Sequence, residues 1–399
     1  MYIAVCCGCL VMNIFEKNIK DCYGCGMCAT VCPHNVIGIE LNESGFYEPS
    51  PINLEHCTNC GLCLKTCSIV DDKLSLNKLE IKSYGAWSND SEVRRKCSSG
   101  GVGFEIGRTL IADGYKVCAV RFNAEANRAE HFVASTVEEL EASIGSKYIQ
   151  SYTLDGFRAV NRQQKNVIIG TPCQIDSFRR YINITKQEDN FVFVDFFCHG
   201  VPSKLLWDKY LKWVKSKVGE ISSVTWRNKK AGWHESWDMS IKGNKSEFNS
   251  KLSQGDIFYR LFLSDTCLGK ACYEKCKYKY DQSSADIRLG DAWGFHYDNN
   301  EDGVSCAIAF TAKGNELLHR LNCTLEELSF DTVCEWQMKK CANKPHFNKK
   351  MMSMLKDETI EIEEIMDKSE TFLRWMRLKD RLMNPRRTIM NILKRFRKL

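Results

Sequence analysis

The sequence predicts a small cysteine-rich α+β module followed by a larger α/β domain. Two features of the 399 residues support this division: closely spaced cysteines gather in residues 13–70, and apolar runs alternate with Gly-rich turns and helical stretches from residue 81 onward. The polar stretch Asp71 to Lys78 lies between them and is typical of a linker. A chain of this length can bury one small and one large hydrophobic core.

Composition indicates a globular protein inside the cell. Hydrophobic residues make up 44% and charged residues 27% of the chain. No apolar run approaches the roughly 20 residues of a membrane-spanning helix. The apolar start, residues 2–12, lacks the basic segment and cleavage site of a secretory signal. We therefore expect a cytoplasmic protein, in which the 22 cysteines serve metal binding rather than disulfides.

The net charge of +6 is concentrated at the C-terminal end. Residues 371–399 contain ten Lys or Arg and one acidic residue, Asp380, which leaves 46 basic and 49 acidic residues in 1–370. Because the body is mildly acidic, we expect no nucleic-acid partner.

Two cysteine runs form a repeat in the N-terminal module. Each has the spacing C-x-x-C-x-x-C-x-x-x-C, the first containing Cys22, Cys25, Cys28 and Cys32 and the second Cys57, Cys60, Cys63 and Cys67. This is the pattern of bacterial ferredoxins, in which three close cysteines and one distant cysteine hold each of two 4Fe–4S clusters. The module is therefore predicted to be of the bacterial-ferredoxin type.

The same spacing predicts that each cluster takes its distant ligand from the other run. Cys22, Cys25 and Cys28 would share one cluster with Cys67, while Cys57, Cys60 and Cys63 would share the other with Cys32. Zinc ribbons are the alternative, because they also use C-x-x-C pairs in four-ligand sites. Eight cysteines in duplicated triplet-plus-one spacing exceed what zinc needs, so clusters are favoured.

From residue 81 the pattern predicts strand–turn–helix units. Strands are expected at Val117 to Val120, Val167 to Ile169 and Phe191 to Phe197, and helices at Phe104 to Ile111, Ile175 to Tyr181 and Leu205 to Val214. Such repetition favours an α/β domain with a largely parallel sheet, because helical crossovers join parallel strands.

Six strings follow one another in this domain: Cys97-Ser-Ser-Gly-Gly101, Gly145-Ser-Lys-Tyr-Ile-Gln-Ser151, Gly170-Thr-Pro-Cys-Gln-Ile175, Phe197-Cys-His-Gly-Val-Pro-Ser203, Trp226-Arg-Asn-Lys-Lys-Ala-Gly-Trp233 and Ala285-Asp-Ile-Arg-Leu-Gly-Asp-Ala-Trp293. In this order they resemble the beta subunit of coenzyme F420 hydrogenases and dehydrogenases. That flavoprotein family includes bacterial members with an N-terminal two-cluster ferredoxin module. The resemblance implies that the α/β domain binds FAD.

The candidate flavin-binding residues lie in three of the six strings: Ser98, Ser99, Gly100, Gly101, Lys147, Tyr148, Gly170, Thr171, Pro172 and Cys173. Residues 98–101 offer hydroxyls, backbone N–H groups and a helix N-terminus, which together suit a pyrophosphate. A simply capped helix explains the same four residues, and the resemblance is what favours FAD. Residues 170–173 follow a buried strand, where ligands of α/β domains tend to bind.

The resemblance also implies a third 4Fe–4S cluster near the flavin. Its candidate ligands are Cys198, Cys267, Cys272 and Cys276. This sequence departs from the family pattern, since three residues rather than two separate Cys272 from Cys276, and Cys267 falls outside the motif. Cys173 is the substitute ligand, and buried cysteines without metal are the alternative.

These features predict an iron–sulfur flavoprotein oxidoreductase that passes electrons between a ferredoxin-like carrier and a small-molecule substrate. Clusters carry single electrons and flavins also exchange pairs, which is a reason for one chain to hold both. The alternatives are a non-catalytic electron-relay subunit of a larger redox complex and a structural or nucleic-acid-binding zinc protein. The expected domains are 13–70 for the clusters, 81–345 for FAD and 346–399 for a helical C-terminal region.

The C-terminal tail, Phe372 to Leu399, is predicted to form a basic amphipathic helix. Its apolar residues recur at helical spacing among six Lys or Arg, at Ile389, Ile392, Leu393 and Phe396. Two roles stay open for this tail. It would either contact an anionic membrane surface or dock on the chain's own body, including the acidic stretch Asp357 to Glu364.

Overall fold

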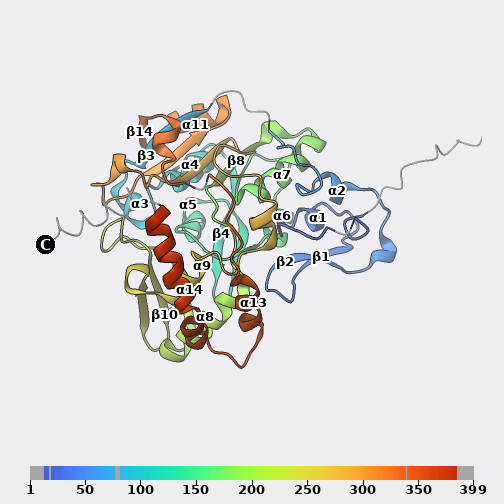
Figure 1. Cartoon of the computed structure of the whole chain (residues 1–399). Helices are drawn as coiled ribbons and strands as arrows, with labels where there is room; N and C mark the ends of the chain where they lie inside the picture. The colour runs from blue at the N-terminus through green and yellow to red at the C-terminus, as the bar shows by residue number, and fades with distance from the viewer. Residues whose placement is uncertain (1–12, 18, 77–80, 338, 384–399) are drawn as a thin grey trace, which may run out of the picture.

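The computed structural model describes residues 13–17, 19–76, 81–337 and 339–383. Figure 1 shows the N-terminal module on the right of a larger α/β body. In the module, β1 (Ile37–Leu41) and β2 (Tyr47–Pro51) form an antiparallel hairpin, and α1 (Met27–Thr30), the 3-10 turn η1 (Leu54–His56) and α2 (Leu62–Lys65) complete the fold. The small α+β module expected from the cysteine repeat is confirmed.

The body is built on a nine-stranded sheet, with the order β14-β3-β13-β12-β8-β7-β4-β5-β6 among the described residues. Its strands are β3 (Lys82–Ser88), β4 (Lys116–Asn123), β5 (Arg128–Ala134), β6 (Ser151–Tyr152), β7 (Asn166–Ile169), β8 (Phe191–Phe196), β12 (Ile287–Asp291), β13 (Ser305–Ala309) and β14 (Cys323–Glu327). The three predicted strands are confirmed as β4, β7 and β8.

The sheet is mixed, so the prediction of a largely parallel sheet was wrong. β4, β7, β8 and β12 run parallel at its centre, whereas β3, β13 and β14 on one side and β5 on the other join by antiparallel pairing. The reason is that β4–β5 and β12–β13 follow each other without an α-helical crossover, and only a crossover enforces parallel pairing.

Helices cover both faces of the sheet. α4 (Val102–Ala112), α5 (Val137–Leu140) and α11 (Ala312–Arg320) share one core with Val117 and Val167 of the sheet. α6 (Leu154–Arg158) and α7 (Pro172–Thr185) share another with the next residues along the same strands, Cys118 and Ile168. Successive strand residues face opposite sides, so the two helical layers lie on opposite faces.

A further hydrophobic core, separate from the two that flank the large sheet, joins the later helices to a small sheet. It holds α8 (Lys204–Val218), α9 (Ile257–Phe262), α13 (Asn348–Lys356), α14 (Ile362–Met383) and the antiparallel strands β9 (Ile221–Thr225), β10 (Asp238–Gly243) and β11 (Glu247–Lys251). The predicted helices are confirmed within α4, α7 and α8. No helix in the described part of the chain has the length and apolar character of a membrane span.

Short elements connect these layers. They are α3 (Ser91–Lys96), α10 (Lys270–Glu274), α12 (Phe330–Val333) and the 3-10 turns η2 (Glu141–Ser143), η3 (Glu188–Asn190), η4 (Leu252–Gln254) and η5 (Phe295–Tyr297). Of the predicted tail helix, the part up to Met383 belongs to α14, and residues 384–399 lie outside the described residues.

Hydrogen bonds fasten the module to the body. The Gln150 side chain accepts from the Tyr47 N–H at 2.8 Å and donates to the Tyr47 carbonyl at 3.2 Å. Thr153 Oγ1 donates to the Cys25 carbonyl at 3.1 Å, and Ser203 Oγ donates to the Ser44 carbonyl at 2.7 Å. The hairpin and the first cysteine run are thereby held against the body.

Candidate functional site

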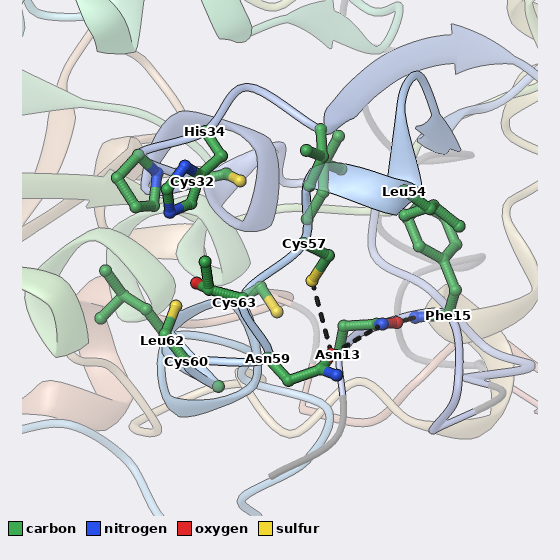
Figure 2. A pocket seen from close by; sticks show the side chains of 15 residues that line it. Asn13, Phe15, Cys32, His34, Leu54, Cys57, Asn59, Cys60, Leu62 and Cys63 are labelled. Carbon is green, nitrogen blue, oxygen red and sulfur yellow. Dashed lines mark hydrogen bonds between the residues drawn. The ribbon is translucent and has the colours of Figure 1, made fainter.

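Four cysteines line the outer cavity of the module. They are Cys57, Cys60 and Cys63 from the second run and Cys32 from the first. Figure 2 shows their sulfur atoms directed toward the same space. Asn13 closes one side, since its Nδ2 donates to Asn59 Oδ1 at 3.2 Å. The cavity therefore gathers the cysteine set expected for one crossed cluster.

The inner cavity is lined by the complementary set of cysteines. Cys22, Cys25 and Cys28 of the first run line it together with Cys67 of the second. Burial raises the pKa of the Cys28 thiol, and Cys25, Cys22, Cys67 and Cys63 raise it further. Because Cys63 belongs to the outer set, the two cavities adjoin.

The two runs fold alike because each places a glycine at the same point. Gly26 and Gly61 are the N-caps of α1 and α2, with φ of 77° and 70°. Left-handed backbone of this kind favours glycine. In each cysteine run it turns the chain so that the third cysteine lies in the short helix that follows. Gly26 is restricted further, since an added Cβ would lie 2.0 Å from Thr153 Oγ1 of the body.

A third group of cysteines lies where the module meets the body. Burial raises the pKa of the Cys173 thiol, and the neighbouring Cys25, Cys198 and Cys272 thiols raise it further. Burial raises the pKa of Cys272 to about 12, with contributions from Cys198 and Cys276. The structure thus brings together Cys173, Cys198, Cys272 and Cys276, next to Cys25 of the inner cavity.

Cys267 is a candidate that the structure leaves outside this group. Its side chain is fully buried and belongs to the same hydrophobic core as α8 and α9. Burial there raises the pKa of its thiol to about 12. Its carbonyl accepts from the Ser203 N–H at 2.8 Å, so Cys267 supports the turn that carries Cys198. Cys173, at the start of α7, stands in its place.

Direct hydrogen bonds connect the six strings identified in the sequence. Ser146 N donates to Ser98 Oγ at 3.0 Å, and Lys229 Nζ donates to the Ser99 carbonyl at 2.8 Å. Arg227 binds Asp291 at 2.7 Å, which links the fifth string to the sixth. Three further bonds complete the connections: Phe197 N to the Leu289 carbonyl, and Gln174 to Ser151 and to the Thr171 N–H. All six strings form one contiguous region.

The N-terminus of α4 lies in this region, and the backbone N–H groups of its first turn have no side-chain cap. Gly101 is its N-cap with φ of 88°, and no side chain caps the helix. The first turn of such a helix leaves backbone N–H groups without helical partners and favours an anion. Ser98 adds a hydroxyl that already accepts from the neighbouring Ser146 N–H.

Two buried lysines flank the same loop. Lys147 Nζ donates to the carbonyls of Ser143, Ile144 and Gly145 at 2.7 to 3.1 Å. Lys229 Nζ donates to the carbonyls of Ser99 and Asp302 at 2.8 and 2.6 Å, and to that of Arg94. Among the described residues, neither ammonium has a carboxylate within salt-bridge distance. Each ammonium therefore has three carbonyl acceptors and no direct carboxylate partner among the described residues.

Burial lowers the pKa of both lysines. The pKa of Lys147 falls to about 7 and that of Lys229 to about 8, while the Cys97 thiol acts in the opposite direction on each. An anion at this position would stabilise both charged forms, because opposite charge offsets the loss of hydration. The donors, the helix terminus and the two cations therefore fit the phosphates of a dinucleotide.

Gly100 is required for a reason that the sequence did not indicate. An added Cβ would lie 2.3 Å from the Ala86 carbonyl and 2.7 Å from the Ser305 N–H. Its own N–H donates to Ser305 Oγ at 3.0 Å. The residue packs the loop against β3 and β13, and its small size is required by this packing.

The remaining candidates lie around this loop. Tyr148 stacks on Trp237, with ring centroids 4.9 Å apart and an interplanar angle of 17°. Gly170 and Thr171 form the turn from β7 into α7, where Gln174 Oε1 accepts from the Thr171 N–H at 2.9 Å and Pro172 opens the helix. This start of α7 is therefore already capped, and it presents Cys173 toward the third group.

Sequence reasoning missed several residues of the site. Lys229 lies inside a recognised string, yet a lysine in a run of polar residues gave no signal of burial. Gln150, Thr153 and Ser177 join the module to the body, and Ser177 Oγ accepts from Cys25 Sγ at 3.4 Å. These contacts span more than 100 residues of sequence, so no local pattern indicates them.

A ferredoxin-type module with two four-cysteine cavities, docked on an α/β body, defines an iron–sulfur redox protein. Residues 21–69 match the family described as 4Fe-4S dicluster domain. Two further matches are to the family described as coenzyme F420 hydrogenase/dehydrogenase, beta subunit: residues 83–156 match its N-terminal part and residues 163–329 its C-terminal part. These two matches together span more than half of the chain. The protein belongs to the coenzyme F420 hydrogenase/dehydrogenase beta subunit family.

The curated proteins contain no match to this chain. Among solved structures, a xenon-derivatised F420-reducing NiFe hydrogenase complex from Methanosarcina barkeri contains a similar chain. The two chains share 17% identity over 75% of this chain and 94% of the other, with a TM-score of 0.44.

Proposed function

We propose that this protein is an FAD-dependent iron–sulfur oxidoreductase that passes electrons between a ferredoxin-like carrier and a small-molecule substrate. The observation that carries the proposal is the grouping of its cysteines. Two cavities each gather three cysteines of one run and one of the other, as two crossed 4Fe–4S clusters require. A third group adjoins the inner cavity through Cys25 and Cys173.

In the proposed arrangement, Cys32, Cys57, Cys60 and Cys63 hold the outer cluster, and Cys22, Cys25, Cys28 and Cys67 hold the inner one. Four thiols per cavity match the four irons of a cube. Burial raises the thiol pKa values in the inner cavity, to about 11 for Cys67. Ligation must therefore displace protons there, and these thiols would lose them only to bound metal.

Cys173, Cys198, Cys272 and Cys276 are proposed to hold a third 4Fe–4S cluster. Burial raises the pKa of the Cys198 thiol, and the charge of Lys279, whose Nζ donates to the Cys198 carbonyl at 2.7 Å, partly offsets that rise. A nearby cation suits a site at which thiolates gather negative charge.

FAD is proposed to bind at the loop 97–101. The uncapped first turn of α4 and Ser98 would hold its phosphates, and the ammonium groups of Lys147 and Lys229, which are bonded to nearby carbonyls, would add positive charge beside them. When bound, the clusters supply one-electron steps, and the flavin exchanges single electrons with them and electron pairs with a substrate. The side chains of the six strings then serve to hold and orient the cofactors and to exclude water.

Anaerobic purification with counts of iron, sulfide and flavin per chain tests this proposal. We expect one flavin and about twelve irons, from four per cube. The reduced protein should then be re-oxidised with candidate acceptors, coenzyme F420 among them. Clusters without flavin or turnover would favour a relay subunit of a larger redox complex, and a colourless zinc protein would refute the proposal.

Two cysteine variants test the crossed assignment. Cys32→Ser should remove the outer cluster and Cys67→Ser the inner one, although each residue lies in the other run. The spectrum of each variant shows which cluster remains. The reference for the outer set is Cys60→Ser, which changes a cysteine of the close triplet. If Cys32→Ser and Cys60→Ser lose different clusters, the crossed assignment is wrong.

A further inference from the structure

The C-terminal half of α14 carries an apolar stripe that the body does not cover. The first half of the helix is docked, with Ile362, Ile365 and Leu373 buried against α8, α9 and α13. Beyond it, Trp375, Leu378, Leu382 and Met383 are 52, 56, 72 and 72% exposed. At 100° per residue, Trp375, Leu378 and Leu382 fall on the side of the helix opposite to the docked residues. The stripe is thus directed away from the protein core.

Positive charge surrounds this stripe. Glu370 is shared by three guanidinium groups, with Arg260 at 2.6 Å, Arg374 at 2.9 Å and Arg377 at 3.3 Å. One carboxylate therefore faces three cations. Lys379 adds a fourth, 5.3 Å from the Trp375 ring centroid. The sixteen residues that follow α14 in the sequence, 384–399, add six Lys or Arg and no acidic residue.

The acidic stretch that offered an intramolecular partner is already occupied. Glu361 pairs with Lys212 at 2.7 Å, and Glu364 pairs with Lys368 at 2.6 Å. Glu363 accepts from the Trp213 indole N–H. Since these carboxylates have cationic or polar partners on α8 and α14, they leave little charge to attract a basic tail.

We infer that the C-terminal half of α14 is a docking surface for an anionic lipid bilayer. A helix with an exposed Trp and Leu stripe, flanked by Arg and Lys, suits the boundary between acyl chains and acidic headgroups. The apolar side chains would enter that boundary while the guanidinium and ammonium groups bind headgroup phosphates. Figure 1 shows α14 on the α/β body, apart from the cysteine-rich part of the N-terminal module.

Co-sedimentation of the complete, anaerobically purified chain with vesicles tests this inference. We expect binding to vesicles of phosphatidylcholine with phosphatidylglycerol and none to phosphatidylcholine alone. The triple variant Trp375→Ser, Leu378→Ser, Leu382→Ser should bind roughly a hundredfold more weakly, because three apolar side chains lose their burial. Arg377→Gln and Lys379→Gln should each weaken binding about fivefold.

A matched control separates the stripe from exposed apolar surface in general. Leu41, Ile52 and Ile184 are 42, 56 and 43% exposed elsewhere, and changing all three to Ser should leave vesicle binding unchanged. Equal loss in both triple variants, equal binding to neutral vesicles, or no binding would overturn the inference. So would a dimer in analytical ultracentrifugation that only the α14 variant dissolves, since the stripe would then bind a second copy.

Discussion

Removing the carboxylate of Asp195 should destabilise the body more than any exposed charge change. Asp195 on β8 and Arg288 on β12 are paired in register on adjacent parallel strands, and both side chains are fully buried. Arg288 Nε and Nη2 donate to the two carboxylate oxygens at 2.8 and 2.7 Å. Such a bidentate pair compensates two charges that would each be costly to bury alone.

The expected cost follows from what Asp195→Ala leaves behind. The Arg288 guanidinium would stay buried with only the carbonyls of Tyr280 and Gln282 as partners, and Ser283 would lose its acceptor. Breaking one partner of a buried pair typically costs about 3–5 kcal/mol of unfolding free energy. The segment 280–283 follows Cys276, so we also expect the iron content to fall from about twelve toward about eight per chain.

Urea unfolding under anaerobic conditions, followed by far-UV circular dichroism, measures this cost. The control is Asp113→Ala, which breaks an ion pair with Arg320 at 2.6 Å whose side chains are 36 and 55% exposed. An exposed pair contributes about 0–1 kcal/mol. Equal losses in the two variants would contradict the argument, because the buried, bidentate pair should then be worth no more than the exposed, singly bonded one.

Three further results are expected. Burial lowers the pKa of Lys147 to about 7, so the binding of FAD phosphate should take up a proton. The affinity for FAD, measured by flavin fluorescence, should therefore fall as pH rises above about 7, by at most about tenfold per pH unit. Lys147→Met should remove that pH dependence. Cys173→Ser should lose about four irons per chain, whereas Cys267→Ser should lose none. Loss of iron in Cys267→Ser but not in Cys173→Ser would show that Cys267 is the ligand of the third group. Burial lowers the pKa of His131 to about 4 against about 6.5 unfolded, so its neutral form stabilises the fold above about pH 6.5. As pH falls from about 6.5 to about 5, the free energy of unfolding should decrease by roughly 2 kcal/mol because the unfolded state binds a proton at His131. The same pH dependence in His131→Gln would refute this role of His131.

Local patterns in the sequence were sufficient for the centre of the sheet and for the cysteine repeat. Apolar runs followed by glycine turns predicted β4, β7 and β8, because buried parallel strands need apolar residues on both faces. The edges were not predictable in the same way. Whether β13 pairs with β3 or with another strand depends on partners more than 200 residues apart in sequence, and no local signal specifies them.

The third cysteine group shows the same limit within a site. The family resemblance, together with the close spacing of Cys267, Cys272 and Cys276, suggested these three as one ligand set with Cys198. The direction of a side chain depends on packing, however, and the side chain of Cys267 belongs to the same hydrophobic core as α8 and α9. Cys173 follows β7 and Cys198 follows β8, and these two strands are parallel neighbours. Their carboxyl ends therefore bring the two cysteines to the same end of the sheet.

The geometry of α7 accounts for the order of the three cysteine groups. Cys173 and Ser177 are four residues apart in this helix, so their side chains lie on the same face. Ser177 Oγ accepts from Cys25 Sγ and donates to Ser68 Oγ at 2.9 Å, so it touches both runs beside the inner cavity. Cys173, one turn earlier, belongs to the third group. A single turn of α7 therefore spans the boundary between module and body, and the proposed electron path passes from outer to inner to third cluster along it.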